Sequence, residues 1–114
     1  IWPGHDHPMP WHGCIFFAKY VWERVGGEKS LVLTSEGRSR VALSCGGEIH
    51  IPADNPKYRT KPIILHEIAH ELTSFDQHGP GFVSVYMDLC VRFLGMDRAY
   101  LEDTASRYGV RFLH

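Results

Sequence analysis

The sequence predicts a domain of the α+β class, in which a small group of β-strands lies between helices. Apolar residues recur three and four positions apart near the start of the chain and throughout its second half, whereas they alternate with polar residues over 30–52. The 114 residues suffice for one domain with a modest core, and their 44% hydrophobic and 22% charged content is ordinary for a globular protein. We therefore interpret residues 1–114 as a single domain.

The first elements along the chain are an irregular arm and a helix. Residues 1–13 contain three prolines, which favours an arm without regular structure. Over residues 14–25 the apolar side chains fall at helical spacing, and the two glycines that follow are expected to end the helix. We expect the histidines of the arm to be solvated, although they could bind a second metal ion: His5, His7 and His12.

Three short stretches with a spacing of two are predicted to be strands, over residues 30–34, 40–44 and 48–52. The last two are joined by Cys45-Gly46-Gly47, a tight reversal that predicts an antiparallel hairpin.

The strand over 48–52 is expected to lie at the edge of the sheet or to end at Pro52. Pro52 has no N–H to donate to a neighbouring strand, and proline is tolerated mainly at edges and ends of strands. Ile49 and Ile51 are expected to face the core, and His50 between them the solvent.

Helices are predicted over residues 61–73 and 80–94, with the chain reversing between them, and a last helix is expected between Asp97, which caps it, and Gly109. The helix over 80–94 has an apolar stripe at positions Phe82, Tyr86, Leu89 and Phe93. In the last helix four residues are expected to face inward: Tyr100, Leu101, Ala105 and Tyr108.

A group of histidines and glutamates on the helix over 61–73 has the spacing of a zinc site. His66 and His70 are four residues apart and therefore lie one turn apart on one face, where both imidazoles can reach one ion. Glu67 is rotated by about 100°, so it is expected to address a water at the ion rather than to ligate. Glu71 lies farther from the ion and is expected to hydrogen-bond a neighbouring element.

Zinc needs a third protein ligand, for which His78 is the first candidate. It lies eight residues after His70, in a segment where the helix should have ended, so that a reversing chain could return it to the ion. The alternative is a carboxylate from a following helix, either Asp88 or Glu102.

The stretch HEIAHELTSFDQHGPGFVSVYMDL resembles the core of a family of small, single-domain metallohydrolases of the zincin class. Its H-G-P-x-F element is also similar to that of SprT-like and WLM metalloproteases. The resemblance is specific over residues 61–95 and looser over 14–52. It implies a minimal zincin-like domain with structural residues at Gly79, Pro80 and Phe82, a catalytic base at Glu67, and zinc ligands at His66, His70 and His78.

These features predict a zinc-dependent hydrolase, and more narrowly a metallopeptidase that acts on a peptide or protein. Glu67 would accept a proton from the attacking water and pass it to the leaving amine. A substrate strand could pair with residues 48–52. Tyr86 and His50 could stabilise the oxyanion, but we interpret both as structural. The alternative function is a non-catalytic, zinc-stabilised binding or regulatory module, for example one that associates with DNA. The intact Glu67 favours the enzyme.

Composition excludes other classes. The net charge of -1 gives no global attraction to nucleic acid or membrane, and no apolar run approaches the ~20 residues of a membrane span. Three cysteines without a C-x-x-C pair are typical of a reducing compartment, here the cytoplasm. A small basic loop is expected to be solvated rather than bound to nucleic acid: Lys57, Arg59 and Lys61. The oligomeric state is not indicated.

Overall fold

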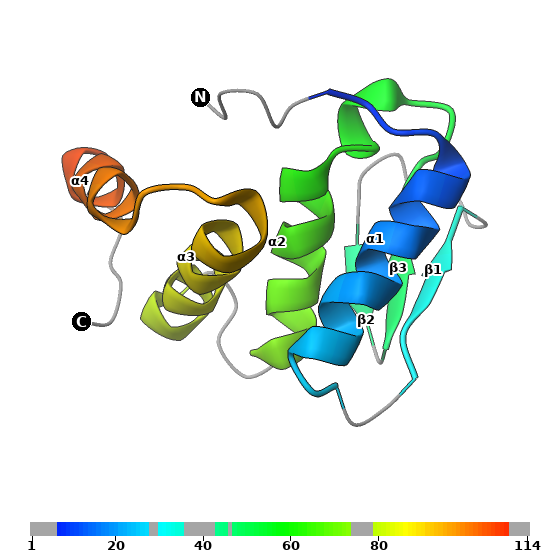
Figure 1. Ribbon diagram of the computed structural model, residues 1–114, viewed down its shortest axis with the longest axis horizontal. Helices are drawn as coiled ribbons and strands as arrows, with labels where there is room; N and C mark the ends of the chain where they lie inside the picture. Colours follow the sequence, from blue (N-terminus) through cyan, green and yellow to red (C-terminus); the bar gives the residue numbers. More distant parts are fainter. Residues whose placement is uncertain (1–6, 28–29, 36–42, 46, 74–78, 110–114) are drawn as a thin grey trace.

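The strands β1, β2 and β3 are grouped between helix α1 and the later helices α2, α3 and α4, so the expected α+β class is confirmed (Figure 1). The computed structural model describes residues 7–27, 30–35, 43–45, 47–73 and 79–109. Its elements are α1 (Trp11–Arg24), β1 (Val32–Thr34), β2 (Leu43–Cys45), β3 (Glu48–His50), a short 3₁₀ helix η1 (Pro56–Tyr58), α2 (Lys61–Leu72), α3 (Pro80–Leu94) and α4 (Arg98–Arg107). Among the described residues, no helix is long and apolar enough to cross a membrane.

Helix α1 begins at Trp11, three residues before the predicted start, so the irregular arm ends at Pro10. Pro10 is extended and occupies the N-cap position, and its carbonyl accepts a bond from the Cys14 N–H. Gly13 lies in the first turn of the helix, and one glycine there costs only about 1 kcal/mol, less than the packing of the helix returns.

Strand β3 lies at the centre of the sheet, so the edge position predicted for residues 48–52 is wrong. The strand order is β1-β3-β2, with β1 parallel and β2 antiparallel to β3. Pro52 does not interrupt the pairing because β3 ends at His50, two residues earlier. The Ile51 N–H nevertheless continues the contact with β1 by donating to the Thr34 carbonyl at 2.9 Å.

The antiparallel hairpin of β2 and β3 is confirmed, although residues 40–42 of the predicted strand lie outside the described residues. Cys45 pairs with Glu48, and Gly47 between them has a φ of +87°, a conformation that side chains other than glycine rarely adopt.

The outward orientation predicted for His50 is wrong, whereas the inward orientation of its neighbours is confirmed. Ile49 and Ile51 are fully buried, and His50 is only 9% exposed. Alternation along a strand predicts an exposed side chain only where that face of the sheet is open to solvent, so alternation alone does not expose every second side chain.

The helices pack in a succession that places α2 in the middle of the molecule (Figure 1). Helix α1 contacts β1, α2 contacts β2, and the two helices contact each other, so that both lie on the sheet. Helix α3 packs against α2, and α4 against α3. The fully buried side chains come mainly from α1, β3 and α2: Cys14, Val21, Ile49, Ile51, Ile64, Leu65, Ile68 and Cys90.

Helix α4 begins as predicted but buries less than predicted. The Asp97 side chain accepts a bond from the Ala99 N–H at 3.2 Å, which confirms the N-cap. Leu101 is buried, whereas Tyr100 is 45% and Tyr108 79% exposed, so the inward orientation predicted for the tyrosines is wrong. The helix lies at the end of the succession, and its main contact among the described elements is with α3. Most of its surface is therefore in solvent.

Candidate metal centre

Helix α2 carries both buried apolar residues and the polar residues of the candidate site. Thr60 precedes its first turn, and Pro62 lies in that turn, where no intrahelical N–H is lost. Neighbours on several sides bury its apolar residues, and Ile64, Leu65 and Ile68 are fully buried. A helix held by α1, β2 and α3 offers a rigid base for the side chains between these contacts.

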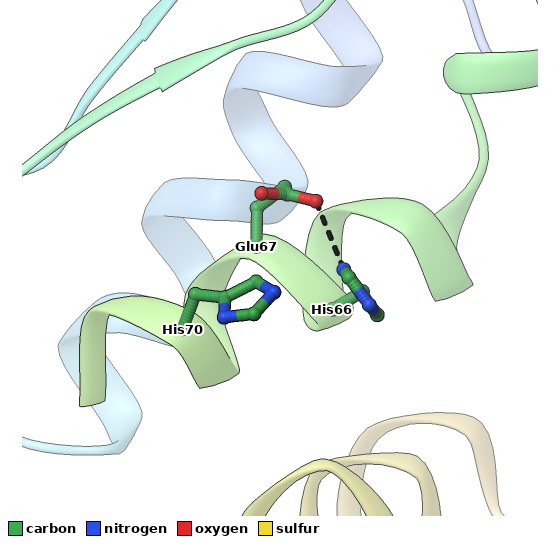
Figure 2. Close-up of side chains that lie close together, drawn as sticks. All are labelled: His66, Glu67 and His70. Atoms are coloured by element: carbon green, nitrogen blue, oxygen red, sulfur yellow. Dashed lines mark hydrogen bonds and ion pairs between the residues drawn. The ribbon is translucent and has the colours of Figure 1, made fainter. Parts of the chain in front are cut away.

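The structure brings His66, Glu67 and His70 together. One potential ligand atom from each residue lies within 4.8 Å of those of the other two, and no further group of this kind occurs among the described residues. The two imidazole rings are 4.8 Å apart between centroids and lie at 81° to each other. Figure 2 shows His66 and Glu67 on one turn of α2 and His70 on the next. The four-residue spacing thus gives two nitrogen ligands on one face.

Glu67 is the buried member of this group and is hydrogen-bonded to its neighbour. Its side chain is 5% exposed, against 31% for His66, and its Oε2 lies 2.9 Å from Nδ1 of His66 (Figure 2). An ionised carboxylate can only accept, so Nδ1 donates in this pair, and His66 would ligate a metal through Nε2. The bond also offsets the cost of burying the carboxylate.

Helix α3 places two aromatic rings against the histidines, a feature that was not foreseen. Phe82 stacks on His70 with a centroid distance of 4.3 Å, and its ring lies 5.1 Å from that of His66. The Tyr86 ring lies 5.5 Å from His66, and its hydroxyl donates to the Pro62 carbonyl at 3.3 Å. Burial raises the pKa of the Tyr86 phenol well above its usual value. The signals in the sequence were their four-residue spacing in one apolar stripe and, for Phe82, its place in the H-G-P-x-F element.

Glu71 has the role expected of it, a hydrogen bond to a neighbouring element. Its side chain is buried, and its Oε2 accepts a bond of 2.9 Å from the N–H of Gly47, in the β2–β3 turn. The Gly47 carbonyl accepts in turn from the Val32 N–H at 2.9 Å. One residue after His70, helix α2 is therefore tied to the hairpin and through it to β1.

The candidates for the third ligand are one histidine and two carboxylates. His78 lies outside the described residues. Asp88 is exposed and forms an ion pair with Arg98, and Glu102 lies on α4; neither belongs to the group of close ligand atoms found in the described part of the chain.

The remaining histidines and the basic loop form no site among the described residues. His7 and His12 are exposed and belong to no group of potential ligands, and His5 lies outside the described residues. Arg59 donates to the Met9 carbonyl at 3.0 Å, which ties the loop to the arm. The lysines of this loop are exposed, each within cation–π distance of an aromatic ring: Lys57 and Lys61.

The donor set of the group fits zinc. Zinc prefers imidazole nitrogens, and two of them face one position from adjacent turns, with a carboxylate close by that is already held in place. The chain matches no protein-family model, no curated protein and no solved structure.

Proposed function

We propose that this protein is a zinc-dependent hydrolase, most narrowly a metallopeptidase with a zincin-like fold. The observation that carries the proposal is the close grouping of His66, Glu67 and His70, whose ligand atoms lie within 4.8 Å of one another on one helix. The resemblance of HEIAH to the zinc motif of metalloproteases supports the same conclusion. The free thiols of Cys14 and Cys90, both buried, are compatible with a reducing, cytoplasmic compartment.

His66 and His70 would hold the zinc, with His78 as the third ligand. His78 precedes Gly79, which occupies the N-cap position of α3. Phe82, in the first turn of that helix, stacks on His70, so the chain comes close to the group just after His78. This proximity supports His78 over Asp88, which is exposed and paired with Arg98.

Glu67 would act as the general base. Bound zinc would lower the pKa of a water molecule towards neutrality and polarise the substrate carbonyl. Glu67 Oε2 is engaged with His66, so Oε1 is the atom that would accept the proton of the attacking water. The same carboxylate would then deliver the proton to the nitrogen of the leaving amine, which completes amide hydrolysis.

The sheet limits how a peptide substrate could bind. Residues 48–50 are paired on both sides, so the peptide cannot add to β3. The outer edge of β2 is the alternative: β2 is at the end of the strand order and contacts α2, which carries the group. An extended peptide pairing there would be placed beside the metal helix.

A screen of a broad peptide library tests this function. Zinc-loaded wild type and Glu67→Gln should both be folded and metal-bound, but only the wild type should cleave, with the variant's kcat lower by about 10²–10⁴-fold. Glu23→Gln, on the exposed face of α1, is the matched control and should cleave like the wild type. Equal cleavage by Glu67→Gln would refute the mechanism. A zinc-bound wild type that cleaves nothing would favour the non-catalytic binding module.

A further inference from the structure

The side of α3 that faces α2 presents a pair of aromatic rings one turn apart. Phe82 and Tyr86 stack on each other with a centroid distance of 5.9 Å and an interplanar angle of 20°. Phe82 is 3% exposed and contacts both imidazoles, lying face to face with His70 and edge to face with His66. Tyr86 contacts His66 edge to face, at an interplanar angle of 86°. Every ring of the pair therefore touches a metal-binding histidine.

The pair is anchored at its far end. The Tyr86 hydroxyl donates to the Pro62 carbonyl, one turn of α2 before His66. Contacts thus run in antiparallel order along the two helices, from Pro62 with Tyr86 to His70 with Phe82. Turning either ring away from the imidazoles would therefore break contacts between α2 and α3.

An imidazole on a helix surface exchanges between rotamers, and a metal requires one defined orientation of each ligand. If the imidazoles become ordered only when the metal binds, the lost side-chain entropy lowers the metal affinity. Imidazoles that are already ordered in the metal-free protein do not lose this entropy on binding. We infer that Phe82 and Tyr86 are positioning residues, whose rings hold His66 and His70 in the orientation that ligates one ion. The inference rests on the proposed function, because it assumes that these histidines bind zinc.

Zinc affinity of ring-deletion variants tests the inference. Phe82→Leu and Tyr86→Leu should each weaken zinc binding on the order of tenfold, the smaller of the effects seen when residues that contact metal ligands are replaced. Competition with a chromophoric chelator measures the affinity. Tyr86→Phe keeps the ring and loses only the hydroxyl bond to Pro62, so it should recover most of the affinity lost in Tyr86→Leu. Cobalt-substituted Tyr86→Leu should show a weaker visible absorption than cobalt-substituted wild type, because the ligand geometry is less uniform.

Phe93→Leu is the matched control for the loss of an aromatic ring. Phe93 is on the same helix and half-buried, but it packs against Tyr20 of α1 at a centroid distance of 6.1 Å. This variant should lose stability and keep the zinc affinity of the wild type. Tyr86 is only half-buried, so Tyr86→Leu carries the test if Phe82→Leu fails to fold.

The outcomes separate this inference from the proposed function. Wild-type zinc affinity and cobalt absorption in both Leu variants would overturn the inference and leave the zinc site intact. A wild-type protein that binds no zinc would overturn the proposed function and the inference together.

Discussion

Replacing Glu71 by leucine should destabilise the protein and leave its zinc affinity nearly unchanged. The Glu71 side chain is buried and accepts a 2.9 Å bond from the Gly47 N–H, which lies in the turn between β2 and β3. Leucine has a similar size but no acceptor. The hydrogen bond between α2 and the hairpin would be lost, whereas His66 and His70 would keep their ring contacts with α3.

The expected loss is about 2 kcal/mol. A hydrogen bond to a charged acceptor contributes about 1.5–3 kcal/mol, and the Gly47 N–H would be left in a buried position without its carboxylate. Part of this loss is offset because a carboxylate no longer has to be buried. For a domain of this length, the change corresponds to a fall in melting temperature of roughly 8 °C. Glu71→Gln keeps an uncharged acceptor and should lose about half as much.

Urea unfolding followed by tryptophan fluorescence measures the loss, with Trp22 buried in α1 as a reporter. A chelator in the buffer keeps bound metal from adding to the stability of either protein. Amide exchange at Gly47 should accelerate in Glu71→Leu, and the exposed control Glu23→Leu should leave both measurements unchanged. Wild-type stability together with wild-type protection of the Gly47 amide would refute this account of Glu71.

Two further predictions concern the packing of α1 and the buried thiols. Gly27→Ala should lower the free energy of unfolding in urea by about 1–3 kcal/mol, because the added methyl would collide with the Trp22 indole. Gly13→Ala should instead stabilise α1, because its methyl would meet its nearest atom at an ordinary contact distance of 3.5 Å. Burial raises the pKa of Cys14, and raises that of Cys90 to about 12 from an ordinary value of 9.0, so iodoacetamide should label both slowly at pH 8 until urea is added. The folded state favours the neutral form of both thiols, because it raises their pKa values. Their contribution to the free energy of unfolding should therefore be complete below pH 9 and be lost towards pH 12. Thermal unfolding across this pH range measures the loss.

The parts of the fold that depend on neighbours in the sequence were predictable. Helix α3 has the predicted bounds, and the Asp97 cap and the β2–β3 hairpin were also predicted. The position of β3 was not, because its second neighbour, β1, joins through a parallel pairing that no turn residue specifies. The burial of His50 was missed as well, because alternation within a strand does not show whether a face of the sheet is covered.

The candidate site divides in the same way. His66 and His70 share one face of a helix by spacing alone, and Glu67 belongs to the same stretch of sequence. The bond from Gly47 to Glu71 and the rings of Phe82 and Tyr86 come from other elements. The sequence pattern predicted that Gly47 lies in a turn and that Phe82 and Tyr86 belong to an apolar stripe. It could not show which face of α2 these residues would contact.

Titration of zinc into chelator-stripped protein by isothermal calorimetry tests the central claim most directly. The wild type should bind one zinc ion per chain, and tight binding should be lost in His70→Ala and sharply weakened in His78→Ala. The exposed His12→Ala is the control and should bind like the wild type. A wild type that binds no zinc, or a His70→Ala variant that binds it as tightly as the wild type, would contradict the claim that this group is a zinc site.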